Sequence, residues 1–270
     1  MSVKFAYVIA GSEATGGAGL QVDLKTFQQL GVYGIGTITC IVSFDPNANW
    51  GHRFVPVEPQ VIADQFEAAN ASQDLDTVKI GMLGTPATIE VVAKALASKP
   101  WRHVVLDPVL ICKGQEPGAA LDTDTALKEK VLPLATVVTP NNFETKALSG
   151  LASLATVDDL VEAGRRILAL GPQAVVVKGG IDFPGPDAVD VLVQAAPGGG
   201  EPTVEVYSKA KIGQERVSGA GCTFAAAITA ELAKGTALPD AVRVAKALVT
   251  RGIEHRVAGH TPFSTVWQGA

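Results

Sequence analysis

Residues 5–31 read FAYVIAGSEATGGAGLQVDLKTFQQLG and hold an apolar run, a glycine-rich turn and a helix-period segment in that order. The run Phe5–Ala10 has the length and composition of a strand. After the turn, apolar residues recur at positions 20, 24, 27 and 30, which is the spacing of a helix with one buried face. A strand followed by a helix at the start of the chain is the first half of a β-α-β unit.

The same alternation continues along the chain. The expected strands are 36–43, 77–82, 104–109, 136–139 and 174–177, and the expected helices are 61–71, 86–97, 125–132 and 156–171. Two antiparallel strands at 189–194 and 203–207 and two helices at 221–234 and 239–257 complete the pattern. Repeated β-α-β units predict a mostly parallel sheet with helices on both faces in one domain. We expect the residues after Gly259 to form a surface tail.

Composition restricts the classes of partner. The chain has 270 residues, a formal net charge of −5 and 47% hydrophobic residues. Its acidic balance argues against binding of nucleic acid or an anionic membrane surface. No window approaches 18 apolar residues without charge, so we expect no membrane span. The cysteines at positions 40, 112 and 222 form no close pair, which argues against disulfides and zinc and favours the cytoplasm.

Several common catalytic signatures do not occur. The sequence has no G-x-x-x-x-G-K-[ST] loop, no G-x-G-x-x-G after a strand and no G-x-S-x-G elbow. It has no H-E-x-x-H pair. In an open parallel sheet, ligands bind at the carboxyl ends of the strands, so the strand ends are the places to search.

The first such strand end is the glycine-rich turn that begins with Gly11 and Ser12. Its glycines allow backbone and ligand to approach closely, and the following helix presents free N–H groups. The alternative is a tight strand-to-helix turn without a ligand. A second strand end carries Asp107, whose carboxylate would hold a metal ion or serve as a cap or ion-pair partner.

A third strand end is TPNNFE, residues 139–144. Asn141 and Glu144 are three residues apart and share one face of a helical turn. An amide and a carboxylate there suit a hydrated magnesium ion and its phosphate. On spacing alone, Asn141 as a helix N-cap with Glu144 reaching back to it fits equally well.

The fourth is SGAGCT, residues 218–223, which precedes an alanine-rich helix. Small residues at a helix start expose N–H donors to an anion. We expect the helix N-terminus to lower the thiol pKa of Cys222, which would then act as a base or nucleophile. The alternative is close packing of small buried side chains. Lys178 closes another strand, and Asp190 lies in the hairpin that follows; either would touch a nucleotide or simply lie exposed.

These four segments in combination describe phosphoryl transfer, which needs positioning and charge neutralisation more than covalent groups. Their order resembles the vitamin-kinase branch of the ribokinase superfamily, in particular the pyridoxal kinases that are similar to hydroxymethylpyrimidine kinase. The matching segments are IAGSEATGGAGLQVDLKTFQQLGVYG, FDPNANWGH, KIGML, VVLDPVLICKG, ATVVTPNNFE, VVVKGG, AVDVL and GAGCTFAAAITAELAKG. They cover about residues 7 to 250.

The resemblance implies a ribokinase-like three-layer α/β/α sandwich, a single kinase domain over residues 1–270 with a lid segment at about 110–120. It implies ATP and Mg²⁺ as cofactors and a homodimer. By the resemblance, Gly219, Ala220, Gly221 and Cys222 form the anion hole and base, and Asp107 and Glu144 organise the metal. Asn141, Lys178, Asp190, Ser218 and Gly221 correspond to the ATP site, and Gly11, Ser12, Ala18, Val42, Met82, Val109 and Cys112 to the substrate pocket.

Two positions bear on which vitamin is phosphorylated. The pyrimidine kinases carry glutamine where this chain has Phe44, and Cys112 matches the lid cysteine of the pyridoxal kinases, which adds to the pyridoxal aldehyde. The resemblance therefore implies transfer to the 5′-hydroxymethyl group of pyridoxal, pyridoxine or pyridoxamine. Lys178 favours the alternative, a hydroxymethylpyrimidine (phosphate) kinase. Val217 and Ser218 replace the family's usual Thr-His, which leaves an inactive pyridoxal-binding relative as a further alternative.

Overall fold

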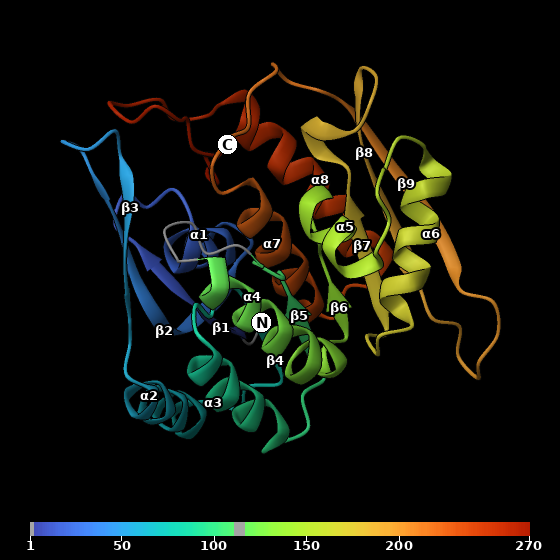
Figure 1. Ribbon diagram of the computed structural model, residues 1–270. Helices are drawn as coiled ribbons and strands as arrows, with labels where there is room; N and C mark the ends of the chain where they lie inside the picture. Colours follow the sequence, from blue (N-terminus) through green and yellow to red (C-terminus); the bar gives the residue numbers. More distant parts are fainter. Residues whose placement is uncertain (1–2, 111–116) are drawn as a thin grey trace.

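A nine-stranded sheet forms the centre of the described part of the chain (Figure 1). The computed structural model describes residues 3–110 and 117–270, with the backbone alone for 117–120. The strands are β1 (Lys4–Glu13), β2 (Val32–Asp45), β3 (Gly51–Pro56), β4 (Thr77–Ile80), β5 (His103–Leu106), β6 (Val137–Val138), β7 (Ala174–Lys178), β8 (Asp187–Gln194) and β9 (Thr203–Ala210). Their order across the sheet is β3-β2-β1-β4-β5-β6-β7-β8-β9.

The six central strands, β2-β1-β4-β5-β6-β7, are parallel, whereas β3, β8 and β9 join the two edges antiparallel. The mostly parallel α/β sheet is therefore confirmed, as is the antiparallel pair β8–β9. The hairpin strand β3 was not predicted. Its side chains are mostly exposed, so it lacks the apolar alternation by which a half-buried strand is recognised.

Helices cover both faces of the sheet. They are α1 (Gly19–Gln29), α2 (Pro59–Ser72), α3 (Pro86–Ala97), α4 (Pro117–Lys130), α5 (Asn142–Ser149), α6 (Val157–Leu168), α7 (Ala220–Lys234) and α8 (Leu238–Glu254), with short 3-10 turns at Leu132–Leu134 and Gly180–Asp182. Helices α1, α7 and α8 lie on one face of the sheet and α2, α3 and α6 on the other (Figure 1). The buried side chains of the first three pack in the cores on their face, and those of the other three pack in the core on the opposite face. The three-layer α/β/α arrangement follows from this packing.

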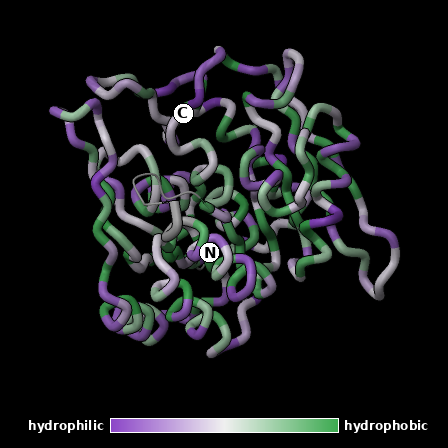
Figure 2. Tube along the Cα trace, in the orientation of Figure 1, coloured by the Kyte–Doolittle hydropathy of each residue, from purple (hydrophilic) through white to green (hydrophobic). Residues whose placement is uncertain are grey.

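The layers are held by burial of the central strands. Side chains alternate between the two cores: Val175 and Val177 of β7 join the core under α6, and Val176 joins the core under α7 and α8. Figure 2 shows hydrophobic stretches on both the strands and the helices that pack on them. Strands buried on both faces read as continuous apolar runs, which explains why the sequence located them well.

Two close approaches of the backbone shape the edge where the strands end. Gly19 begins α1 with a φ of +63°, and a side chain there would collide with the carbonyl of Gly11. Gly219 precedes α7 with a φ of +79°, and a side chain there would collide with the carbonyl of Gly17. Glycine is required at both positions because the left-handed conformation and the lack of space each exclude other residues.

The segment after α8 does not form the expected surface tail. Thr265 forms an antiparallel bridge with Val257 and a parallel bridge with Ser218, and Val266 and Gln268 are buried. That expectation was wrong because the segment has no periodic apolar pattern that would reveal its order. It is held in place by contacts with residues that are distant in the sequence. No helix in the described ranges is long and apolar enough to cross a membrane.

Candidate functional site

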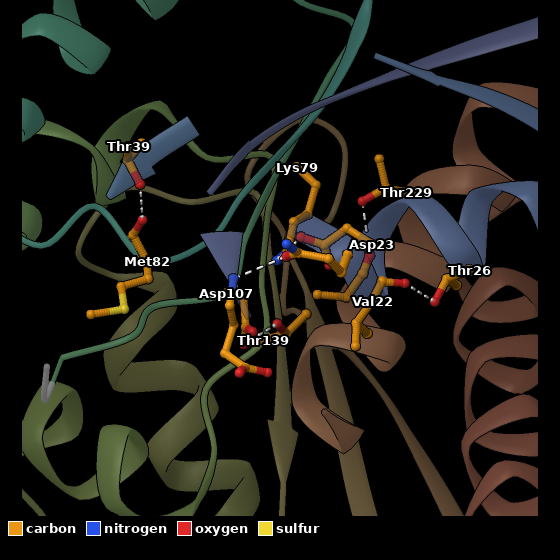
Figure 3. Close-up of polar contacts among 12 residues, drawn as sticks. Val22, Asp23, Thr26, Thr39, Lys79, Met82, Asp107, Thr139 and Thr229 are labelled. Atoms are coloured by element: carbon orange, nitrogen blue, oxygen red, sulfur yellow. Dashed lines mark hydrogen bonds and ion pairs between the residues drawn. The ribbon is translucent and has the colours of Figure 1, made fainter. Parts of the chain in front are cut away.

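A buried ion pair joins two strand ends on the α7 side of the sheet. Asp107 follows β5, Lys178 ends β7, and Lys178 Nζ lies 3.0 Å from Asp107 Oδ1. Thr139, which follows the intervening strand β6, donates a 3.4 Å hydrogen bond to the same oxygen (Figure 3). Burial acts to raise the pKa of Asp107, but the ammonium groups of Lys178 and Lys79 outweigh it and lower that pKa. Asp107 is therefore a carboxylate at neutral pH.

Asn141 and Glu144 form the helix cap that their spacing allowed. The Asn141 side chain accepts the Glu144 N–H at 3.0 Å, and Glu144 Oε2 accepts the Asn141 N–H at 2.8 Å. Burial raises the pKa of Glu144 to about 8; Asp107 adds to the increase, and Lys178 opposes it. A carboxyl group with this pKa would release its proton readily when a cation binds beside it.

The residues present suit a magnesium ion only in combination with a ligand that brings oxygens of its own. Within residues 3–110 and 117–270, no three His, Cys, Asp or Glu side chains gather closely enough to hold a metal. Mg²⁺ is commonly held by one or two carboxylates together with substrate phosphates and water. Asp107 and Glu144, linked electrostatically through Lys178, fit that donor set.

The N-terminus of α7 faces this ion pair. A side chain built on Gly221 would meet Lys178 Nζ at 3.3 Å and Asp107 Oδ2 at 3.9 Å, so the first turn of the helix lies directly against both groups. The helix is 15 residues long, and its N-terminal N–H groups carry a partial positive charge of about half a unit. Together with Lys178, this end of the helix can bind a phosphate.

Cys222 lies in the first turn of α7, but its thiol is not acidified. Burial raises the pKa of Cys222 to about 11, with further increases from Asp107 and Asp23, whereas Lys79 and a hydrogen bond from the Gly19 backbone lower it. The expectation of a lowered pKa was therefore wrong. The cost of placing a thiolate in this surrounding exceeds the effect of the helix N-terminus.

A second buried ion pair, Lys79 with Asp23, was not predicted from the sequence. Lys79 in β4 and Asp23 in α1 have fully buried side chains and lie 2.9 Å apart (Figure 3). Burial raises the pKa of Asp23 to about 6 against the opposing effect of Lys79. The signal was present: Lys79 interrupts an apolar strand, and Asp23 falls on the apolar face of its helix, where lone charges are costly.

The expected substrate residues gather where β1, β2 and β4 end. A side chain on Gly11 would meet Cys40 Sγ at 2.6 Å and Met82 Cβ at 3.9 Å. Thr39 donates a 2.6 Å hydrogen bond to the Met82 carbonyl (Figure 3). Ser12 accepts a hydrogen bond from Gln21, Ala18 is the N-cap of α1, and Val42 is buried in β2.

Phe44, close to the end of β2, belongs to an aromatic cluster. Its ring lies 4.6 Å from that of His52 in β3 and 5.2 Å from that of Phe263, measured between ring centroids. At position 44 the cluster thus presents an aromatic ring, which cannot hydrogen-bond to a polar ring edge as an amide side chain could.

Of three further expected site residues, the structure places two and leaves the third outside the described ranges. Asp190 pairs in register with Lys178, but its carboxylate binds Lys246 of α8 at 2.8 Å. Val109 follows Asp107 by two residues, and its N–H donates to the Asp107 carbonyl. Cys112 and most of the expected lid lie outside the described residues.

Known proteins resemble the chain over nearly its whole length. Residues 13–265 match the family model described as phosphomethylpyrimidine kinase. The chain is 45% identical to a pyridoxine kinase of Bacillus subtilis (strain 168), over 94% of this chain and 92% of that protein.

Two solved structures of similar proteins are complexes with ADP or AMP-PCP. An ADP complex of Bacillus subtilis pyridoxal kinase superposes with a TM-score of 0.90 at 41% identity, covering 100% of this chain and 98% of that chain. The pyridoxal kinase of Staphylococcus aureus in complex with AMP-PCP and pyridoxal gives a TM-score of 0.90 at 36% identity, with 100% and 95% covered.

Proposed function

Because the chain belongs to the phosphomethylpyrimidine kinase family, we propose that it transfers the γ-phosphoryl group of ATP to the 5′-hydroxymethyl group of pyridoxal and related B6 vitamers. The observation that carries this proposal is the Asp107–Lys178 pair set against the N-terminus of α7. Phosphoryl transfer depends on positioning and charge neutralisation, which a lysine, helix N–H groups and a carboxylate for the metal can supply together. Similar proteins bind ADP, AMP-PCP and pyridoxal.

On the nucleotide side, Lys178 and the first turn of α7 neutralise the charge of the transferred group. Asp107 and Glu144 would hold Mg²⁺, which would neutralise part of the phosphate charge when ATP is bound. Asn141 keeps Glu144 oriented through the helix cap. Gly219, Ala220 and Gly221 present the backbone N–H groups, and Ser218 begins the loop that carries them.

On the acceptor side, Gly11, Ser12, Ala18, Val42 and Met82 would surround the vitamin. Cys222 would accept the hydroxyl proton on Sγ. Because its pKa is about 11, the thiol holds its proton at neutral pH, and the reactive thiolate is a minor form. Lys79 and the Gly19 N–H both stabilise that form.

Other parts of the proposal rest on the sequence and the family. We assign Cys112 to hold the pyridoxal aldehyde as a hemithioacetal and Val109 to the substrate pocket. We assign Asp190 to the nucleotide side, where its bond to Lys246 suits a residue that supports the site rather than one that binds ATP directly. We also propose one kinase domain, a homodimer and a cytoplasmic location.

A hydroxymethylpyrimidine (phosphate) kinase is the second candidate, favoured by the description of the matching family model. The Phe44 cluster argues against it, because an apolar ring cannot hydrogen-bond to an aminopyrimidine. The test is release of ADP from Mg-ATP with pyridoxal, pyridoxine or hydroxymethylpyrimidine as the acceptor. We expect turnover with the B6 vitamers. Turnover confined to the pyrimidine would refute the choice of vitamin, and ligand binding without turnover would indicate an inactive relative.

A further inference from the structure

The segment Val257–Gln268, called here the C-terminal segment, is fastened to the end of α8. Val257 and Thr265 exchange two backbone hydrogen bonds of 2.8 and 2.9 Å, which close the segment into a loop. The Trp267 N–H donates to the carbonyl of Gly252 at 3.1 Å. The segment therefore has a fixed position relative to α8 although it contains no helix or strand of its own.

Its first contact with the site is through the loop before α7. The Ser218 N–H donates to the Ser264 carbonyl at 2.9 Å, and the Val266 N–H donates to the Ser218 carbonyl at 3.0 Å. Both backbone groups of Ser218 are thus bound by the C-terminal segment. Ser218 directly precedes Gly219, the residue that sets the direction in which α7 begins.

A second contact reaches the first turn of α7 itself. Gln268 Nε2 donates a 3.0 Å hydrogen bond to Thr223 Oγ1, and both side chains are buried. Thr223 is the neighbour of Cys222 in the chain. A buried amide that loses its acceptor pays the full cost of desolvation, so this hydrogen bond strongly favours one position of the turn.

The same segment also contacts the acceptor side. A side chain on Gly17 would meet Thr265 Cγ2 at 2.5 Å, so the glycine turn after β1 is held between Thr265 and Gly219. The ring of Phe263 packs on that of Phe44 at 5.2 Å between centroids. The C-terminal segment therefore contacts the first turn of α7, the glycine turn after β1 and the ring of Phe44.

We propose that the C-terminal segment is a positioning element of the kinase site, with Gln268 and Thr265 as the residues that hold the first turn of α7 against the glycine turn. This inference rests on the proposed function and extends it to residues that do not touch the reacting atoms. Small displacements of groups that align a phosphoryl group cost far more in rate than in binding, so loss of these contacts lowers kcat more than it raises KM.

The test compares Gln268→Leu and Thr223→Val, which each remove one side of the buried hydrogen bond, with Thr223→Ser, which keeps the hydroxyl. The matched control is His260→Ala, an exposed position in the same segment. Steady-state kinetics with pyridoxal and Mg-ATP are measured for each variant. Amide hydrogen exchange of residues 217–223 is measured in parallel, because it reports the order of the turn without requiring turnover.

We expect Gln268→Leu and Thr223→Val to lower kcat by about tenfold with KM for ATP within about twofold. Exchange of the 217–223 amides accelerates in both variants, while Thr223→Ser and His260→Ala stay close to the wild type. Thermal unfolding confirms that the compared samples are folded. Should either of the first two variants fail to fold, Thr265→Ser, which removes only the methyl group against Gly17, takes its place.

Unchanged kcat in the folded variants overturns the proposal, as does a fall in kcat without faster exchange of the 217–223 amides. An equal loss in His260→Ala also overturns it. If the wild-type protein turns over none of the acceptors, the proposed function fails. The exchange measurement then still decides whether the segment orders the α7 turn.

Discussion

Replacement of Glu144 by glutamine should remove a large part of the pH dependence of stability. The glutamate is buried and its pKa is raised from 4.5 to about 8, chiefly by burial. Between those values the folded protein holds a proton on Glu144 that the unfolded chain has lost. The contribution of this group to the free energy of unfolding is therefore full below pH 4.5 and is lost as the pH rises through about 8.

The magnitude follows from that interval. Between pH 6 and about pH 8, the folded protein holds this proton and the unfolded chain does not, so the free energy of unfolding falls by about 1.4 kcal/mol for each pH unit. The wild type therefore loses about 3 kcal/mol of stability from pH 6 to pH 9. Glutamine does not titrate, and its Oε1 can still accept the Asn141 N–H in the helix cap. Relative to the wild type, the free energy of unfolding of Glu144→Gln should therefore rise by about 3 kcal/mol from pH 6 to pH 9.

Urea unfolding of both proteins at pH 6 and pH 9, with a chelator present, measures this difference. Glu162→Gln makes the same substitution at an exposed position on α6 and should change the difference by less than about 0.5 kcal/mol. An equal stability gap between Glu144→Gln and the wild type at the two pH values would refute the reasoning, because it would mean that Glu144 ionises normally in the folded protein.

Three further predictions concern the buried pair of Lys79 and Asp23 and two of the cysteines. Lys79→Met should lower the free energy of unfolding by about 3–5 kcal/mol in urea denaturation, because it leaves Asp23 buried without its partner; adding Asp23→Leu should restore part of the loss, and no recovery would contradict this account. Cys222→Ala should lower kcat at least about 100-fold, while the affinity for ADP, measured by calorimetry, stays unchanged. In the wild type, kcat should rise with pH between 7 and 9 because the thiol pKa is about 11. Near-normal turnover of the variant would exclude Cys222 as the base. Cys112→Ala, outside the described residues, should reduce kcat/KM for pyridoxal by at least about tenfold more than for pyridoxine, which has no aldehyde; equal effects would exclude the hemithioacetal.

The strands and helices that could be predicted are those whose signals are local. Helix α3 was predicted with its observed bounds because Thr85 caps it, with its side chain accepting the Thr88 N–H, and Pro86 occupies the first helical position. The capping box at Thr156 located the start of α6 in the same way. The buried parallel strands were visible as apolar runs.

The features that could not be predicted depend on distant residues. Strand β3 is ordered by pairing with β2, and its own sequence, GHRFVP, buries no residue. The C-terminal segment is ordered by bonds to Ser218 and Gly252. The residues within such a segment do not indicate which distant residues it will contact.

The candidate site shows the same division. The strand ends that carry Asp107, Lys178 and the α7 turn could be named because parallel strands place their carboxyl ends together. The sign of the Cys222 pKa shift could not, because it depends on how completely the helix start is enclosed. The bond between Asp190 and Lys246 likewise depends on where α8 packs.

The central claim, phosphoryl transfer to a B6 vitamer, is tested most directly by competition. The wild-type protein receives Mg-ATP with an equimolar mixture of pyridoxal and hydroxymethylpyrimidine, and the phosphorylated products are separated and quantified against the ADP formed. The account predicts that pyridoxal 5′-phosphate is the dominant product and equals the ADP released. A dominant pyrimidine phosphate, or ADP formed without either product, would contradict it.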